Sequence, residues 1–276
     1  MKPTLLVSFS GGRTSAYMTK YAVERLSRIY DVHVVFANTG EEHENTLDFV
    51  NNCDKHFGFN TVWVEADVIH GERTATKHKV VTYETASRNG EPFEEVIKKY
   101  GVPNLGYPHC TRELKLNPIH HYMKTITTEY ITAIGIRADE TRRVSKSATK
   151  NKIIYPLVDM KVDKEFILDW WKEQPFDLNL EEREGNCKWC WKKSDKKHMQ
   201  NIHNNPEWYD FPNKMEEQYS ETGGHTDRTI KRYFFRQHRS TKDMFKLYDL
   251  TKGNLLPIDD TESGGCSESC ELYTTD

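Results

Sequence analysis

The sequence predicts an α/β protein with a doubly wound parallel sheet of five strands and a mainly helical C-terminal subdomain. Three observations lead to this fold class. Short apolar runs alternate with helix-like stretches over the first 160 residues, as in a parallel sheet covered on both faces. A Gly-rich loop joins the first apolar run to the first helical pattern. All apolar runs are far shorter than the about 20 residues of a membrane span.

The expected elements follow one another as strand, helix, strand. Apolar runs predict strands at residues 5–8, 32–37, 61–64, 130–136 and 153–156. Helical periodicity predicts helices at residues 14–29, 45–57, 93–100 and 114–124. Residues 70–107 are polar and only weakly periodic, so we expect an insertion or a flap there.

The character of the chain changes after residue 160. We expect an α/β domain over residues 1–160 and a helical, cysteine-containing region over residues 161–276. Residues 166–171 predict an amphipathic helix, and the Gly, Ser and acidic content of residues 253–276 predicts a loop or tail.

The bulk charge and the cysteines narrow the class of protein. The net charge of −3 gives no global field that attracts nucleic acid or an anionic membrane. The N-terminus begins a strand at once, so we expect no signal peptide and a cytoplasmic protein. Six cysteines in a reducing compartment are metal-binding, catalytic or buried rather than disulfide-bonded. Cys53, inside a helical pattern, is most simply a buried small hydrophobe.

The loop after the first strand has the composition of a phosphate cradle. Two glycines let the backbone approach an anion, and the following helix adds its N–H groups and the positive end of its dipole. The alternative is a Gly turn without a ligand, since the Walker A spacing is absent. The candidate phosphate-binding residues are Ser8, Ser10, Gly11, Gly12, Arg13, Thr14 and Ser15.

Polar residues also follow two other strands, where ligands sit in a parallel sheet. The group after the second strand is placed to bind a base or ribose, or forms an ordinary turn. It contains Asn38, Thr39, Gly40 and Glu42. The group after the fourth strand can clamp phosphate or sulfate, or is a solvated charge run. It contains Gly135, Arg137, Glu140, Arg142 and Arg143.

The cysteines suggest a metal or redox centre. Cys187 and Cys190 form a CxxC motif, and Cys110 precedes a predicted helix. If these three meet, they can hold an iron–sulfur cluster with one iron open to a substrate sulfur. If Cys266 and Cys270 of the tail join the CxxC motif instead, a four-ligand structural zinc site results. The sequence leaves both arrangements open.

Taken in order, these motifs resemble the phosphoadenosine phosphosulfate reductase family of the PP-loop adenine-nucleotide α-hydrolase-like superfamily. The likeness is to its stand-alone phage and bacterial members and covers roughly residues 4–195. The matching motifs lie at residues 8–15, 36–50, 110–118, 135–143, 155–157 and 185–190. The resemblance implies a five-stranded PP-loop or HUP-like sheet that binds ATP or a related adenine nucleotide. It places the phosphates on residues 10–15, the adenosine near Asn38 and Thr39, and the arginine run at the phosphate or sulfate end.

Two departures from the family pattern bear on the reaction. Thr14 stands where many PP-loop ATPases carry an Asp that helps with Mg²⁺. The Glu-Cys-Gly-x-His motif of classical sulfonucleotide reductases is absent from the sequence. Cys110, Cys187 and Cys190 instead resemble the cysteines of PP-loop sulfurtransferases that thiolate tRNA bases and hold a four-iron cluster.

The main hypothesis is therefore a PP-loop enzyme that binds an adenine nucleotide and carries out sulfur transfer or redox chemistry. Cys110, Cys187 and Cys190 carry a 4Fe–4S cluster, with zinc as the alternative metal, and Cys110 also serves in catalysis. Arg137, Arg142 and Arg143 stabilise charge that develops on the phosphates, and Mg²⁺ offsets it further.

The sulfur acceptor is open between a tRNA base, DNA and a small metabolite. The basic and aromatic stretch at residues 188–197 permits a nucleic acid. One alternative function is a sulfonucleotide reductase, in which Cys266 or Cys270 attacks the sulfate sulfur and a thioredoxin resolves the product. Another is a non-catalytic nucleotide-binding module with a structural zinc.

Overall fold

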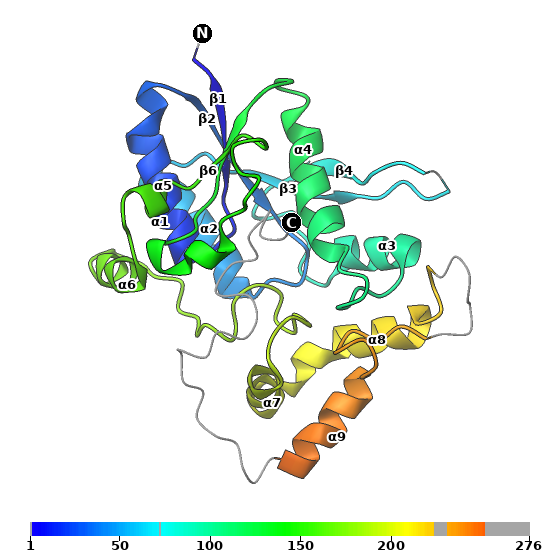
Figure 1. Cartoon of the computed structure of the whole chain (residues 1–276). Coiled ribbons are helices and arrows are strands. Elements are labelled where there is room, and N and C mark those ends of the chain that lie inside the picture. Colours follow the sequence, from blue (N-terminus) through cyan, green and yellow to red (C-terminus); the bar gives the residue numbers. More distant parts are fainter. Residues whose placement is uncertain (1, 72, 224–230, 252–276) are drawn as a thin grey trace.

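The computed structural model describes residues 2–71, 73–223 and 231–251, and Figure 1 shows their arrangement. A single sheet has the strand order β4-β3-β2-β1-β5-β6. The strands are β1 (Thr4–Ser8), β2 (Asp31–Ala37), β3 (Val62–Asp67), β4 (Lys77–Val81), β5 (Ile131–Ala133) and β6 (Ile153–Ile154). Five of them run parallel, which confirms the predicted fold class.

The sixth strand, β4, lies in the segment that the sequence assigned to an insertion or flap. It pairs antiparallel with β3, from Trp63 opposite Val81 to Asp67 opposite Lys77. The prediction was wrong for these residues because an edge strand has no apolar alternation to detect: Lys77, Lys79 and Val80 are exposed. Lysines on an edge strand also discourage pairing with another chain.

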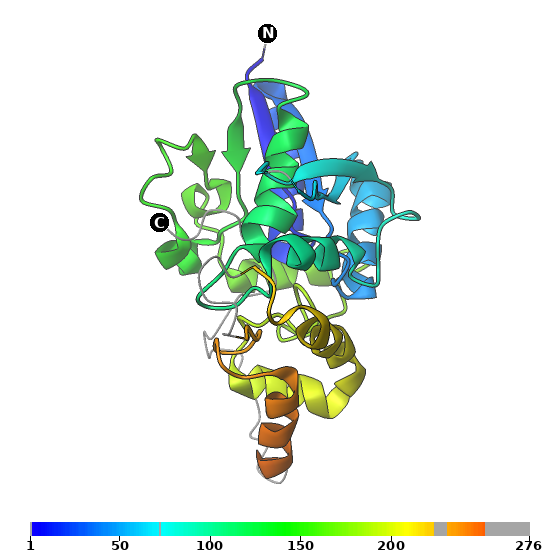
Figure 2. The ribbon, with the colours of Figure 1, turned by 90° about the vertical axis from the view of Figure 1, so that its right-hand side faces the viewer.

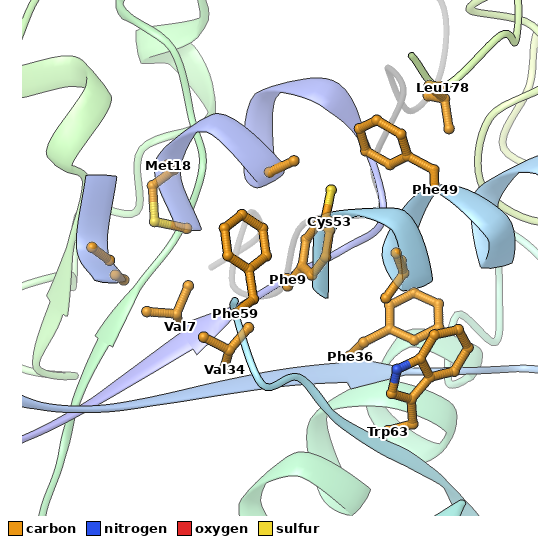
Figure 3. Close-up of a cluster of buried hydrophobic side chains, with 14 of the residues drawn as sticks. Val7, Phe9, Met18, Val34, Phe36, Phe49, Cys53, Phe59, Trp63 and Leu178 are labelled. Carbon is orange, nitrogen blue, oxygen red and sulfur yellow. The ribbon is translucent and has the colours of Figure 1, made fainter. Parts of the chain in front are cut away.

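Helices α1 (Arg13–Glu24) and α2 (Glu44–Phe57) cover one face of the sheet. Figure 3 shows Val7 and Val34 from the strands packed together with Met18 of α1 and Phe49 of α2. Cys53 lies in the same cluster with no exposed surface, as its helical setting predicts. Burial also raises the pKa of its thiol. This thiol is therefore a core side chain.

Helix α4 (Asn117–Met123) covers the opposite face. Its Ile119 and Met123 pack against Leu6 of β1 and Val35 of β2. These strand residues alternate with Val7 and the others of the first face, because successive side chains of a strand point to opposite sides. A sheet buried on both faces follows directly from these continuous apolar runs.

The remaining helices lie mostly at the carboxyl edge of the sheet and beyond it. Short 3-10 turns occur at Leu26–Arg28, Ala138–Arg143 and Pro206–Tyr209, and a π-helical turn at Arg112–Leu116 leads into α4. The helices are α3 (Glu91–Tyr100), α5 (Pro156–Asp159), α6 (Lys164–Lys172), α7 (Asp195–Asn204), α8 (Asp210–Tyr219) and α9 (Thr241–Thr251). None of the helices in the described part of the chain has the length and apolar character needed to cross a membrane.

The region after residue 160 joins two different cores. Ile167 and Trp171 of α6 belong to the cluster that includes α1 and α2. Helices α7, α8 and α9 lie below the sheet in Figures 1 and 2 and share a second cluster with α3. Trp189 and Trp191 of the CxxC motif belong to that second cluster. The domain boundary at residue 160 stays a prediction.

Candidate functional site

The loop between β1 and α1 presents main-chain groups at the carboxyl edge of the sheet. Gly11 has a φ of +82°, and a Cβ there would lie 2.7 Å from Cγ2 of Thr46. Gly12 is the N-cap of α1 and makes no side-chain capping bond. The first turn of α1 therefore has N–H groups without a side-chain cap, the arrangement that binds anions at helix N-termini.

Hydroxyl groups hold this loop in shape. The Ser10 hydroxyl donates to Oγ of Ser15 at 2.8 Å, and the Ser15 hydroxyl is 3.0 Å from the carbonyl of Gly12. Gly135, just after β5, lies against the loop, because a Cβ on it would be 2.9 Å from Cα of Ser15. A larger residue at position 135 would push the loop away from β5.

Arg13 of the loop and Arg137 after β5 make different contacts. Arg13 forms a bidentate pair with Asp177, with Nε–Oδ1 at 2.7 Å and Nη2–Oδ2 at 2.8 Å. Its carbonyl also accepts the indole N–H of Trp171. Nη1 of Arg137 donates to Oγ1 of Thr14 at 3.3 Å. Arg13 thus fastens the segment after α6, while Arg137 reaches residues 8–15, the predicted phosphate loop.

The other charged residues after β5 organise the 3-10 turn at Ala138–Arg143. Glu140 accepts from Arg143 at 2.6 Å and lies 3.5 Å from Arg137. Arg137 also pairs with Asp139 at 2.9 Å, and Arg142 is exposed. Of the three predicted arginines, Arg137 donates to Thr14 of the loop and Arg143 pairs with Glu140.

At the end of β2, Asn38 and Thr39, which were predicted to lie near the adenosine, form hydrogen bonds to other residues of the protein. Nδ2 of Asn38 donates to Oε1 of Glu65 at 2.7 Å and to the carbonyl of Ser87 at 2.8 Å. Its Oδ1 accepts the N–H of Gly40. The hydroxyl of Thr39 donates to Glu42 at 2.8 Å. Asn38 therefore shapes the Gly40 turn from a fully buried position.

The end of β2 also carries the turn that contains Cys187 and Cys190. Glu42 pairs with Cys187 in an isolated antiparallel bridge, and Oγ1 of Thr39 lies 3.5 Å from the sulfur of Cys187. Glu41 accepts the N–H of Lys188 on its carbonyl and the indole N–H of Trp189 on its carboxylate, at 3.0 and 2.5 Å. The chain thus fastens the CxxC turn to the strand next to the phosphate loop.

Glu41 is a residue that the sequence analysis missed. It is 3% exposed, and burial raises the pKa of its carboxyl to about 7. The partial signal was its position in the Asn38–Glu42 polar run, but Glu41 and Glu42 look alike in sequence. Their different partners appear only in the folded chain.

Lys193 is a second missed residue. It is 3% exposed, and its ammonium donates to the carbonyls of Gly185 and Cys187 at 2.9 and 2.7 Å. Its main-chain N–H donates to the carbonyl of Cys190 at 2.9 Å. Lys193 therefore closes the CxxC turn from inside. In the sequence it belongs to the stretch at 188–197, whose basic and aromatic residues permit a nucleic-acid contact.

Cys110, Cys187 and Cys190 line one small pocket, so the structure brings the three predicted cysteines together. The cavity has a volume of about 30 Å³. Its lining also includes Thr39, Thr111, Lys115, Lys192 and the apolar side chains of Phe93, Leu114, Trp189 and Trp191. Cys266 and Cys270 lie outside the described residues.

The pocket holds thiols rather than a preformed ion site. Within residues 2–71, 73–223 and 231–251, no group of three or more His, Cys, Asp or Glu side chains is arranged to hold a metal ion. Burial raises the pKa of Cys187 well above its usual value, and the charge of Glu42 adds to this effect. Lys115 lies 3.8 Å from Oε1 of Glu42, at the edge of the same pocket.

The sequence matches a known domain family and a phage relative of nearly the same length. The model of the phosphoadenosine phosphosulfate reductase domain matches residues 4–153, which include the phosphate loop and Cys110. The uncharacterized nin region protein ORF290 of Escherichia phage lambda is 34% identical over 278 residues, which is 97% of this chain and 94% of the relative.

Two archaeal proteins share only part of the chain. The uncharacterized proteins MJ0066 and MJ0973 of Methanocaldococcus jannaschii are 27% and 28% identical over 154 and 167 residues. These matches cover 55% and 59% of this chain but only 26% and 32% of the archaeal proteins.

Proposed function

The chain belongs to the phosphoadenosine phosphosulfate reductase domain family, and from that premise we propose that it is an enzyme of sulfur chemistry. It binds an adenine nucleotide, ATP or a sulfonucleotide, and transfers or reduces sulfur at the cysteine pocket. One observation carries this proposal: the phosphate loop and the cysteine pocket both form at the carboxyl ends of the strands. The contact between Thr39 and Cys187 joins β2 to the pocket.

Nucleotide binding is supported by the main chain of the phosphate loop. The N–H groups at the start of α1 bind the phosphates, and the shape of the loop is already set by Ser10 and Ser15. Arg137 stabilises charge that develops on a phosphate beside Thr14. Mg²⁺ is expected to bind through phosphate oxygens rather than a carboxylate at position 14. The adenosine contacts the main chain near Gly40, since the Asn38 side chain is already engaged.

The donor set of the pocket suits an iron–sulfur cluster with one open iron. Cys110, Cys187 and Cys190 line it, and thiolates are the usual ligands of such clusters. Lys115 and Lys192 offset the negative charge of thiolates, and the tryptophans exclude water. A four-iron cluster is larger than the cavity, so it binds only if the pocket widens. The fit therefore rests on ligand type and charge. Cys110, Cys187 and Cys190 would hold the cluster, which supplies an iron open to sulfur.

The test is anaerobic purification with analysis of iron, zinc and acid-labile sulfide, and a visible spectrum. We expect about four irons and four sulfides per chain, lost in Cys110→Ala and Cys187→Ala. Cys53→Ala is the matched control, because this cysteine belongs to α2 and lies in the core. The iron content of this variant should equal that of the wild type. A colourless protein with about one zinc per chain contradicts the cluster and supports the non-catalytic module.

Nucleotide binding is tested separately by equilibrium dialysis with ATP. We expect saturable binding to wild type and to Cys187→Ala, since the loop and the pocket are distinct. If the protein releases sulfite from a sulfonucleotide, and this activity requires Cys266 or Cys270, the result would favour the reductase instead.

A further inference from the structure

The connection between β5 and β6 is unusual for a parallel sheet. Parallel neighbours need a crossover, which is usually an α-helix. Here the 3-10 turn Ala138–Arg143 is followed by a series of turns up to β6, with no α-helix. Figure 2 shows this connection, in green, at the edge of the sheet opposite the cyan β4. The connection runs from the carboxyl end of β5, near the phosphate loop, back to the amino end of β6 at the other end of the strands. It must do so because β5 and β6 are parallel.

Residues 141–152, the crossover surface, are strongly basic in a chain whose net charge is −3. They contain five basic residues and no acidic one: Arg142, Arg143, Lys146, Lys150 and Lys152. Every exposed side chain in this stretch is a hydrogen-bond donor, and none is apolar. The exposed residues are Thr141, Arg142, Lys146, Thr149, Lys150, Asn151 and Lys152.

The crossover surface is anchored to the fold. Val144 and Ala148 pack against the cluster formed by Ile134, Ile136, Ile153 and Tyr155. The N–H of Ser145 donates to the hydroxyl of Tyr155 at 3.1 Å, and the N–H of Ile153 to the carbonyl of Ala148 at 2.8 Å. The basic side chains are therefore carried on an ordered backbone, which lowers the entropy cost of binding.

The basic side chains of the crossover surface differ in whether they form ion pairs with other residues of the protein. Arg143 pairs with Glu140 and Lys152 with Glu129. Lys146 and Lys150 are exposed and form no ion pair with any residue that the structure describes. By contrast, the stretch at 188–197 buries Lys193 and Lys197 and leaves Lys188, Lys192 and Lys196 half-buried. The crossover surface thus exposes more of its positive charge than this stretch does.

We propose that the crossover surface binds the phosphodiester backbone of a nucleic acid. Ammonium, guanidinium, hydroxyl and amide groups are those that contact phosphate oxygens. The absence of exposed apolar side chains argues against a protein partner, because protein interfaces need buried apolar anchors. The surface leads directly to Arg137, which touches the phosphate loop, so a bound strand passes beside the site. That this nucleic acid is the sulfur acceptor rests on the proposed function; the binding surface does not.

The test is fluorescence anisotropy with labelled 20-nucleotide probes, single-stranded and duplex, RNA and DNA, between 50 and 300 mM salt. The variant is Lys146→Gln/Lys150→Gln. Both side chains are exposed, and neither residue belongs to the phosphate loop or lines the cysteine pocket. We expect about tenfold weaker binding at 50 mM salt. The slope of log K against log salt should flatten by about 1.4 for single strands or 1.8 for duplexes, as two phosphate contacts are lost.

The control variant is Lys55→Gln/Lys77→Gln, which removes the same charge from exposed positions on α2 and β4. It should bind as the wild type does. Equal losses in both variants, or no binding of any probe at 50 mM salt, overturn the proposal. Binding of an acidic polypeptide but of no nucleic acid also overturns it. ATP binding is measured in parallel to separate the outcomes. If the wild type does not bind ATP, the proposed function is contradicted, but the proposal that the crossover surface binds nucleic acid is not.

Discussion

The phosphate loop and the CxxC turn lie at the same edge of the sheet, but different forces hold them. The loop is made from eight consecutive residues and fixed by glycines and short hydroxyl contacts. The turn is held by two buried ionisable side chains, Glu41 from the end of β2 and Lys193 from the turn itself. The loop should therefore respond to added volume, and the turn to lost charge and to pH. Four experiments test this difference.

The largest effect is expected at Gly11. Gly11→Ala forces a side chain into positive φ and into contact with Thr46, which we expect to cost about 3–5 kcal/mol in unfolding free energy. ATP binding should be lost with it. Gly58→Ala is the matched control, because Gly58 also has positive φ but a Cβ there meets nothing within 4 Å. It should cost about 1–2 kcal/mol. Equal costs in urea unfolding mean that packing does not restrict the loop.

Lys193→Met should come next. It leaves the carbonyls of Gly185 and Cys187 without their ammonium donor, at a cost of about 2–4 kcal/mol. Iron content after anaerobic reconstitution should fall, because the turn that presents two cysteines loosens. Lys197→Met is the control: this lysine is equally buried but pairs with Glu182, away from the turn. If both variants load iron as the wild type does, Lys193 does not hold the turn.

A smaller effect is expected from pH through Glu41. Since burial raises the pKa of this carboxyl to about 7 from 4.5, its stabilising contribution is complete below about pH 4.5 and is lost as the pH rises to 7. The loss is up to about 3 kcal/mol. Glu41→Gln should remove the part of the decline that Glu41 causes while keeping an acceptor for Trp189. Unfolding curves at pH 5, 6 and 7 measure it.

Glu216 provides the comparison for Glu41. Burial raises its carboxyl pKa to about 7 as well, but it accepts N–H groups of Phe234 and Thr241, away from the cysteine pocket. Glu216→Gln should flatten the same pH profile without changing iron content. A pH profile that neither substitution alters would show that these carboxyls are not the source of the decline.

The smallest effect is expected where Arg13 fastens the phosphate loop to the segment after α6. Asp177→Asn removes the charge that pairs with Arg13, and the pair is partly exposed, so we expect a loss of about 1 kcal/mol. Burial opposes ionisation, but the hydrogen bonds from Arg13 lower the pKa of Asp177 below its usual value. Its contribution is thus present above about pH 4 and lost in acid. Wild type and variant should converge in stability as the pH is lowered further and the Asp177 carboxyl becomes protonated.

The sequence predicted the parts of the molecule that depend on neighbours in the chain. Strand periodicity and Gly11–Gly12 predicted the parallel sheet and the loop on it, because these are local patterns. The meeting of Cys110 with Cys187 and Cys190 was left open, since it depends on the packing of α3 and α7. The folded chain likewise decides that Lys193 and Lys197 are buried while Lys146 and Lys150 are exposed. Residue type alone does not distinguish these lysines.

The link between Glu41 and Trp189 spans 148 positions of the chain, and this separation matters while the protein is being synthesised. The phosphate loop and β2 leave the ribosome early, whereas the CxxC turn follows after about 7–30 s at the usual rates of about 5–20 residues per second. During that interval Glu41 has no indole to bond, and Cys110 has none of its pocket partners. A nascent chain can therefore form the predicted phosphate loop before the three cysteines of the pocket can meet, which makes completion of the pocket the last event in assembling the candidate site.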